Sequence, residues 1–379
     1  MKRTLAFLSL LLLITNVKEL YSQPISAFTD IQRNFQIFDQ GSKKKIESLL
    51  PLDYKIGRIA IPYIDNSKNF KIYSNGHSVK INDGFTNRFE ATDNLIAYYN
   101  ARALWVWENG ETYLLTGIAE QSYVSDSLVL YFDGVQKEFK AYYQGEIYPI
   151  EDYLGSSNRL SFDGNVTEGM SIASGQLPSA KVGPNIAAYV DYSEQFKYFK
   201  QGEIHTLESY LIQSFDVGRN IIAYVDGDGY FKILYNDEVQ ELESFAPQSY
   251  AAGNEMVAYI DEAGYFKIFY KNELIEVGYF DAQFQVKDNV IAFSNSSKQF
   301  LGFYEGQFYT LENFTPSEIK MSYNSIAFVG SGKALKLFTK GEIHEVTRAD
   351  IQSWDLNYDV LKYQFGRSMI KVFYEGETY

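Results

Sequence analysis

The sequence predicts an all-β protein built from about ten repeats, each a four-stranded antiparallel sheet of about 35 residues. Three observations support this prediction: a fixed repeat interval, two strand-like runs in each repeat, and one turn position with a restricted choice of residue. The interval between equivalent residues is 34 or 35 at every step but one, as the positions of Phe35, Phe70, Leu104, Phe139, Phe196, Phe231, Phe266, Phe300, Leu335 and Ile370 show. A constant interval of this length is the signature of a repeat architecture.

Each repeat begins with a short run of β-branched and aromatic residues, such as residues 221–225. The run is too short for a helix and suits a half-buried strand. A turn is predicted where this run ends, because eight repeats carry Asp or Asn there: Asp30, Asp65, Asn100, Asp133, Asp191, Asp226, Asp261 and Asn295. The chain then returns in a second strand of alternating apolar and polar residues, often with Lys after the aromatic residue.

The restricted position lies six residues after the Phe231 position. It holds Gly41, Gly76, Gly110, Gly145, Gly202, Asp237, Asn272, Gly306, Gly341 and Gly376. Gly, Asn and Asp are the residues that tolerate a left-handed backbone, which the primed turns of tight hairpins require. A third strand is expected after each hairpin, and a weaker fourth strand leads into the next repeat.

Four short antiparallel strands per repeat favour a β-propeller, in which radial repetition protects the sheet edges. One large ring, two smaller propellers and an open curved β-repeat array all fit the spacing. Residues 220–235 resemble the second and third strands of TolB-like and WD40-like β-propeller blades, in which an Ile-Ala-Tyr strand, an Asp-Gly turn and an aromatic return strand recur. The resemblance covers nearly the whole chain and implies a fold rather than a function. The shorter period and the ten copies depart from those families.

The N-terminus predicts export. Lys2 and Arg3 precede an apolar run over residues 5–14, which is typical of a signal peptide and too short to remain as a membrane span. We therefore expect a signal peptide over residues 1–22 and a β-propeller domain over residues 23–379 with an insert at 155–176. The chain has no cysteine, so export without disulfides favours a bacterial periplasm, cell surface or extracellular location.

Composition narrows the choice of partner. The formal net charge of −14 argues against nucleic acid as a ligand. Because equivalent turns of a propeller share one rim, the Asp series and a second series of Glu residues near the hairpin turns predict carboxylates on both faces. The 32 Tyr and 28 Phe are largely explained by repeated strand positions, and a carbohydrate-stacking surface is the alternative. No apolar stretch later in the chain predicts a transmembrane segment, and the sequence leaves the oligomeric state open.

Two local irregularities are candidate binding sites. The single interval of 57 residues places an insert between the fourth and fifth repeats, and its polar residues include Asn158, Arg159, Asp163 and Glu168. Long loops in compact folds are often functional. The other irregularity is Trp105, which stands where most repeats carry Lys and either anchors a partner or packs against a neighbouring blade.

No pattern calls for catalysis or a cofactor. The sequence contains no His-rich metal cluster, Gly-rich phosphate loop or nucleophile elbow. Asp226 and Asp228 are the best local candidates for calcium, but the further spaced oxygen ligands of a calcium loop are missing. The predicted function is a secreted, non-enzymatic β-propeller that binds or scaffolds proteins in the bacterial cell envelope. The alternative is a carbohydrate-binding or carbohydrate-active propeller that uses rim carboxylates and aromatics.

Overall fold

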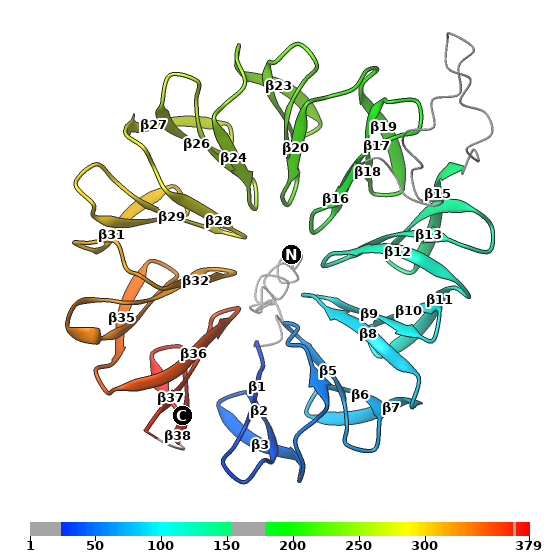
Figure 1. The fold of residues 1–379 in the computed structure, drawn as a ribbon, viewed down its shortest axis with the longest axis vertical. Coiled ribbons are helices and arrows are strands. Elements are labelled where there is room, and N and C mark those ends of the chain that lie inside the picture. Colours follow the sequence, from blue (N-terminus) through cyan, green and yellow to red (C-terminus); the bar gives the residue numbers. More distant parts are fainter. Residues whose placement is uncertain (1–23, 153–178, 367–368) are drawn as a thin grey trace, which may run out of the picture.

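A computed structural model describes residues 24–152, 179–366 and 369–379 of the chain. In these residues the strands form ten antiparallel sheets, which stand as blades around one central channel (Figure 1). The predicted ten-bladed β-propeller is confirmed, and the single ring settles the choice against two smaller propellers or an open array.

The strands follow one another from blade to blade. Blade 1 contains β1 (Ser26–Thr29), β2 (Phe35–Asp39) and β3 (Ser42–Glu47); blade 2 contains β4 (Asp53–Tyr54), β5 (Ala60–Ile64), β6 (Asn69–Ser74) and β7 (His77–Asp83); blade 3 contains β8 (Thr86–Ala91), β9 (Leu95–Asn100), β10 (Ala103–Glu108) and β11 (Glu111–Thr116); blade 4 contains β12 (Ala119–Val124), β13 (Leu128–Asp133), β14 (Glu138–Tyr143) and β15 (Glu146–Asp152); blade 5 contains β16 (Ser179–Val182), β17 (Ile186–Val190), β18 (Phe196–Lys200) and β19 (Glu203–Glu208).

The second half of the ring has the same order. Blade 6 contains β20 (Ser214–Val217), β21 (Ile221–Val225), β22 (Phe231–Tyr235) and β23 (Glu238–Glu243); blade 7 contains β24 (Ser249–Ala252), β25 (Met256–Ile260), β26 (Tyr265–Tyr270) and β27 (Glu273–Tyr279); blade 8 contains β28 (Phe284–Lys287), β29 (Val290–Ser294), β30 (Phe300–Tyr304) and β31 (Gln307–Glu312); blade 9 contains β32 (Ile319–Ser322), β33 (Ser325–Val329), the 3₁₀ turn η2 (Ser331–Lys333), β34 (Leu335–Thr339) and β35 (Glu342–Thr347); blade 10 contains β36 (Ile351–Asn357), β37 (Val360–Phe365), β38 (Met369–Tyr374) and β39 (Glu377–Thr378).

Within each four-stranded blade the first strand lines the channel and the fourth forms the outer rim (Figure 1). The hairpin between the third and fourth strands has the predicted primed geometry. In blade 6, for example, Asn236 and Asp237 both have positive φ, at 52° and 62°. This turn matches the right-handed twist of the flanking strands, which is why the sequence restricts its residues so strongly.

A β-bulge recurs in the outer strand pair of nine blades. In blade 5, Phe196 pairs with Glu208 whereas Lys197 pairs with Thr206, so one residue of β19 is left over between them. A bulge of this kind turns the following side chain to a new direction. It therefore controls where the acidic residue at the end of β19 points.

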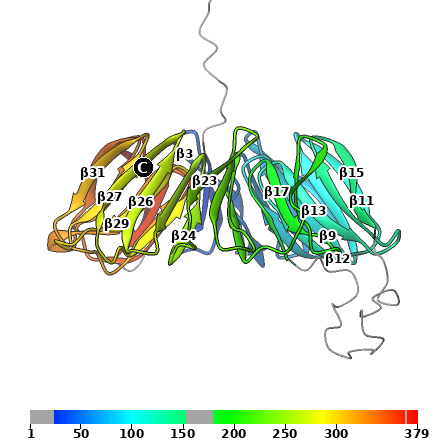
Figure 2. The same cartoon turned by 90° about the horizontal axis from the view of Figure 1, so that it is seen from above.

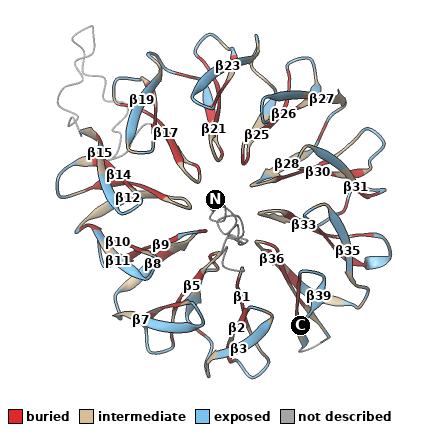
Figure 3. Ribbon diagram, turned by 180° about the vertical axis from the view of Figure 1, so that it is seen from behind, coloured by how far each residue is buried: buried red, intermediate tan, exposed pale blue. Residues whose placement is uncertain are grey.

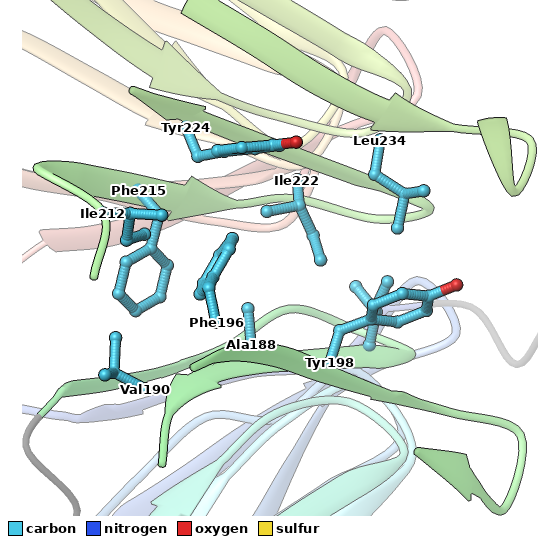
Figure 4. Close-up of a cluster of buried hydrophobic side chains, with 10 residues drawn as sticks. Ala188, Val190, Phe196, Tyr198, Ile212, Phe215, Ile222, Tyr224 and Leu234 are labelled. Carbon is cyan, nitrogen blue, oxygen red and sulfur yellow. The ribbon is translucent and has the colours of Figure 1, made fainter. Parts of the chain in front are cut away.

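The core lies between blades (Figure 3). The cluster between blades 5 and 6 is typical (Figure 4): Phe196 lies 5.0 Å from the ring of Phe215 and 5.3 Å from that of Tyr224. Burying one large apolar side chain contributes about 1.5–3 kcal/mol, so each blade depends on both neighbours for its stability. The repeated aromatic positions of the sequence are mainly these inter-blade contacts.

The ring closes by side-chain packing between blades 1 and 10. Phe28 and Phe38 join Val360, Val372 and Tyr374 in one apolar cluster. No sheet in the described residues combines strands from both ends of the chain. Closure therefore depends on the same kind of contact that joins every other pair of blades.

The disc has two different faces, seen from the side in Figure 2. Because the strands alternate in direction, the first-to-second and third-to-fourth turns lie on one face, which we name the hairpin face. The second-to-third turns and the links between blades lie on the other, which we name the linker face. In blade 6 residues 218–220 and 236–237 belong to the hairpin face, and residues 209–213 and 226–230 to the linker face.

Candidate functional site

The linker face presents the exposed apolar side chains that lie in or beside the loops. They occur in the links between blades and in the second-to-third turns of several blades: Ile31, Leu49, Leu50, Leu52, Phe85, Val135, Tyr210, Leu211, Tyr230, Phe245, Tyr265, Tyr279 and Phe314. Among the described residues, no exposed large apolar side chain lies in a turn of the hairpin face. The other exposed apolar residues lie on β38 and on outer strands, where each of five comes directly after the Glu beside a hairpin turn: Ile147, Ile204, Val239, Leu274 and Ile343. Large apolar surface gathered on one face is characteristic of an interaction site.

The hairpin face is polar and acidic. One Glu follows or lies near the hairpin turn in most blades and is exposed: Glu111, Glu146, Glu203, Glu238, Glu273, Glu342 and Glu377. The prediction of carboxylates is therefore confirmed on this face. The two faces of the disc differ in chemistry as well as in topology.

On the linker face the prediction that the Asp series forms a rim of carboxylates was wrong for five of its members. Asp65, Asp133, Asp191, Asp226 and Asp261 are all buried. Asp226 accepts hydrogen bonds from the backbone N–H groups of Asp228 and Tyr230, as expected for a turn, and its other oxygen lies 2.6 Å from Nζ of Lys232. Burial alone would raise the pKa of Asp226, but Lys232 and the two N–H groups outweigh burial and lower that pKa below its ordinary value.

Lys232 also joins two blades. Its ammonium lies 3.0 Å from Oε1 of Glu208, which is at the end of β19 in the preceding blade, and the Tyr224 hydroxyl donates to the same carboxylate. The β-bulge in blade 5 directs Glu208 to this position. Three further blade boundaries repeat the Glu–Lys–Asp–Tyr set through Glu47–Lys71–Asp65–Tyr63, Glu151–Lys197–Asp191–Tyr189 and Glu243–Lys267–Asp261–Tyr259.

The hairpin end of the channel holds a cluster of charged residues from distant blades. Nη2 of Arg219 donates to Oδ2 of Asp126 at 3.0 Å, and it lies 3.9 Å from Oδ2 of Asp93. On the other side of Asp93, Arg58 lies 3.9 Å from the same oxygen and 4.6 Å from the ring centre of Tyr323. Burial, and then the negative charge of Asp126, raise the pKa of Asp93 to about 6.

This cluster borders a cavity of about 470 Å³. The charged residues that line the cavity are Asp93, Asp126, Asp216, Asp288 and Lys287, so carboxylates predominate. The turns around it approach one another closely: a Cβ on Gly218 would lie 1.8 Å from the carbonyl oxygen of Gly253. The first-to-second turns of blades 6 and 7 therefore require glycine at residue 218.

A second hollow of about 770 Å³ opens near the linker end of the channel. Its wall comes from blades 7, 8 and 9 and includes Tyr250, Phe284 and Phe293 together with the polar residues Gln285 and Ser294. Glu318 is the charged residue of this wall. The hollow combines apolar surface with hydrogen-bonding side chains, which is the usual composition of a binding pocket.

The structure places the predicted site residues as follows. The insert at 155–176, with Asn158, Arg159, Asp163 and Glu168, lies outside the described residues. Trp105 is half-buried, packs against the apolar cluster between blades 2 and 3, and stacks on Tyr98 at 6.4 Å. These contacts match the packing interpretation of Trp105. The carboxylate of Asp226 is occupied by Lys232 and backbone N–H groups, and Asp228 is exposed.

The described residues contain no group of three or more His, Cys, Asp or Glu side chains arranged to hold a metal ion. They also contain no helix with the length and apolar character needed to cross a membrane.

The sequence analysis did not identify the Glu residues that, like Glu208, pair with a Lys of the next blade. It also did not identify the charged cluster at the hairpin end of the channel. The sequence does mark these Glu residues, because each stands twelve residues after the recurring apolar position of its repeat. They are Glu47, Glu151, Glu208, Glu243 and Glu312. No sequence pattern marks the contact between Arg219 and Asp126, because these residues belong to blades 6 and 4 and their separation is not a multiple of the repeat length.

Comparisons with solved structures find matches of low sequence identity and low structural overlap. A computationally designed protein, Ika8, is 15% identical, with 76% of this chain and 96% of that chain covered and a TM-score of 0.35. Hsv2p from Kluyveromyces lactis is 11% identical, with 67% and 92% covered and a TM-score of 0.32. Prp20p from Saccharomyces cerevisiae, whose structure is described with its binding to Gsp1p and histones, is 10% identical, with 65% and 81% covered and a TM-score of 0.31.

A search of curated proteins finds no match. A protein-family model described as a 10-bladed beta propeller domain matches residues 19–379. This match covers nearly the whole chain and agrees with the ten sheets of the structure. The chain is therefore a member of the ten-bladed β-propeller domain family.

Proposed function

We propose that this protein is a non-enzymatic binding module that holds a protein partner on its linker face. The observation that carries the proposal is the difference between the faces: the exposed apolar loop residues lie on the linker face, whereas the hairpin face is acidic. Aromatic side chains such as Phe85, Phe245 and Phe314 are a residue type that is enriched in the cores of protein interfaces. A rigid ring holds them in fixed positions before binding, which lowers the entropy cost of association.

The proposal includes export to a bacterial periplasm, cell surface or extracellular space. It is supported by the basic start and short apolar run of residues 1–14 and by the absence of cysteine. A cell-envelope protein is the kind of partner that fits this location.

Substitutions of exposed apolar residues in the linker-face loops and on the outer strands test the proposal. A Phe85→Ser/Phe245→Ser variant should weaken binding of the captured partner at least tenfold, since truncating two interface aromatics costs more than 1 kcal/mol each. The matched control is Ile204→Ser/Val239→Ser, which removes two exposed apolar side chains from outer strands. Partners are captured from envelope extracts, identified by mass spectrometry and titrated against each variant. Equal loss in both variants, or no loss in the first, would contradict docking on the linker face.

A glycan ligand is the second candidate. Tyr265 and Tyr279 are exposed on the linker face, and their ring centres lie 5.3 Å apart. Aromatic rings in such a position provide a stacking surface for a sugar ring. A glycan array probed with the protein and with a Tyr279→Ser variant tests this candidate, and a blank array would remove it.

A further inference from the structure

Blade 1 differs from the other blades in the strand that lines the channel. Its sheet contains β1, β2 and β3, which occupy the second, third and fourth strand positions of the repeat, whereas each of the other nine sheets contains four strands. Among the described strands, none pairs with the channel-side edge of β1, which is therefore the innermost described strand of this blade (Figure 1). An unpaired edge presents backbone N–H and C=O groups and is a template for an added strand.

One core position next to this edge is left partly uncovered. At five boundaries between blades, an aromatic residue of the first strand packs on the recurring apolar residue of the preceding blade, with ring centres 5.0–5.3 Å apart: Phe35–Tyr54, Phe70–Phe89, Phe196–Phe215, Phe231–Tyr250 and Phe266–Phe284. In blade 10 the recurring residue is Ile370, which is half-buried, whereas its nine equivalents are at most 1% exposed. An apolar side chain on an added strand would cover Ile370 in the same way.

A buried hydroxyl lies beside the same edge. Ser26 is fully buried, and its Oγ has no hydrogen-bond partner within the described part of the chain, although the other nine blades carry an apolar residue at this position. Its equivalent in blade 6 is Ile222, which lies opposite Val217 of the first strand. A strand added to β1 in this register would place one residue over Ile370 and, two residues later, another beside Ser26.

A lysine spans the gap left by the missing strand. Lys362 of β37 stands where most blades carry Ala, and its Nζ donates to the carbonyl oxygen of Ala27 in β1 at 3.0 Å. Burial lowers the pKa of Lys362, and Asp355, whose charge opposes this, is bound to Lys320 at 3.2 Å. The ammonium of Lys362 therefore has no ion pair of its own among the described residues, and a carboxylate on an added strand would supply one.

The residues that precede β1 in the chain do not match this edge. By the repeat spacing, residues 18–21 would stand at the position of β20 and residues 22–24 at that of the turn after it. Pro24 would then take the place of Asn220 and Glu255, whose φ values are 58° and 54°, whereas proline is restricted to a φ of about −65°. Glu19 would take the position of Phe215, which is apolar in most blades. The proposed export also removes residues 1–22.

We propose that an extended segment of a protein partner adds to β1 as an antiparallel strand and completes blade 1. The segment carries an apolar side chain that covers Ile370 and, two residues later, an Asp or Glu that accepts hydrogen bonds from Lys362 and Ser26. Its backbone binds the Ala27 carbonyl, which releases the Lys362 ammonium for that carboxylate. This inference rests on the proposed function, because the partner docks on the linker face, where the first strands of the blades begin.

Fluorescence anisotropy with two peptides of identical composition tests the inference. The protein is the exported chain as recovered from the producing cell, with its first residue established by mass spectrometry. The first probe is Thr-Phe-Thr-Glu-Thr with fluorescein on its N-terminus and an amidated C-terminus, and the second exchanges Phe and Glu. The chain should bind the first about tenfold more tightly, since only this order buries the Phe ring and pairs the Glu carboxylate. Equal binding of the two probes, or binding of neither at millimolar concentration, would overturn the inference.

Substitutions locate the bound peptide. Ile370→Ser should weaken binding of the first probe about fivefold, whereas the matched Ile343→Ser, on an exposed outer strand, should leave it unchanged. Lys362→Met should abolish the preference for this probe over one with Gln in place of Glu, and Lys371→Met should keep that preference. Equal effects of the two Ile substitutions, or a Glu preference that survives Lys362→Met, would place the peptide elsewhere and overturn the inference.

The test also separates other occupants and the wider proposal. If the recovered chain retains residues 18–21 and Glu19→Pro raises its affinity for the first probe, the chain's own segment is the occupant and the partner strand is excluded. A dimer that dissociates when the first probe is added, as measured by analytical ultracentrifugation, would identify a second copy and also overturn the inference. The Phe85→Ser/Phe245→Ser variant should lose partner capture but keep peptide affinity. Failure of the peptide test with intact dependence of capture on these Phe residues rejects strand addition alone.

Discussion

Asp93 contributes to a pH dependence of stability. Burial and the negative charges of Asp126 and Asp288 raise the pKa of Asp93, whereas Arg58 and Arg219 lower it. The side chain of Tyr358 also interacts with Asp93. Because the folded pKa of about 6 lies above the ordinary value, the folded state binds this proton more tightly than the unfolded state. The contribution of Asp93 to the free energy of unfolding is therefore fully present at low pH and falls as pH rises from about 4 to about 6.

An Asp93→Asn variant should lose this part of the pH dependence. The difference in free energy of unfolding between the variant and the parent protein should shift in favour of the variant by about 1–3 kcal/mol from pH 4 to pH 7.5. Urea titrations at several pH values measure the difference, and Asp281→Asn, at an exposed position, is the control. Parallel pH profiles for Asp93→Asn and the parent would show that burial does not shift this carboxyl.

Gly218 provides a prediction about close packing. A Cβ at this residue would meet the backbone carbonyl of Gly253 at 1.8 Å, and backbone cannot rotate away as a side chain does. Gly218→Ala should lower the free energy of unfolding by about 1–3 kcal/mol, the usual cost of overpacking. Gly117→Ala is the matched control, since its Cβ would meet nothing within 4 Å. Equal thermal shifts in the two variants would refute the predicted clash.

At the scale of the strand and hairpin, the Glu–Lys–Asp set links sequence to stability. Lys232 neutralises Asp226 in its own blade and Glu208 in the preceding one, and the Asp226 carboxylate is almost fully buried. Lys232→Met should lower the free energy of unfolding by about 3–5 kcal/mol, because it leaves a buried charge without its partner. Lys181→Met removes a more exposed pair and should cost less than about 1 kcal/mol. Chemical denaturation of both variants provides the comparison, and similar costs would contradict the role assigned to burial.

The strands and hairpins were predictable from sequence because each depends on local chemistry that every repeat shares. A turn with positive φ accepts few residues, so Gly202 and its equivalents are visible without a structure. The burial of the Asp series was not predicted, although Asp226 and Lys232 both stood in the repeat. Their pairing depends on how neighbouring blades face each other, and a pattern within one repeat does not contain that information.

At the scale of the whole ring, the seam between blades 1 and 10 yields a prediction. Phe38 lies 6.1 Å from the ring of Tyr374 and 5.1 Å from that of Tyr379. Phe38→Ala should cost about 3–5 kcal/mol, as for other buried aromatics. Hydrogen exchange should then accelerate first in β1–β3 and β36–β39, since no shared strand holds them together. Phe269→Ala, a matched loss at the boundary between blades 6 and 7, should accelerate exchange in those two blades instead, and uniform acceleration in both variants would contradict a local seam.

The ring itself and its number of blades followed from the period of the sequence, but the proposed binding surface and the charged cluster of the channel did not. Residues such as Phe85 and Phe245 occupy links of variable composition, where no repeat pattern marks them as neighbours. Arg219 of blade 6 reaches Asp126 of blade 4, and Arg58 of blade 2 reaches Tyr323 of blade 9, because the ring closes around one axis. Sites that form between distant blades are properties of closure and cannot be read from any single repeat.

The unlike faces of the disc also limit how copies can associate. Stacking head to tail would press the apolar loop residues of the linker face onto the exposed glutamates of the hairpin face, which desolvates charge without compensation. Two copies meeting through their linker faces would cover both apolar surfaces and leave only acidic exteriors, which repel further additions. The unlike faces therefore disfavour the repeated head-to-tail contact by which a disc would grow into a filament.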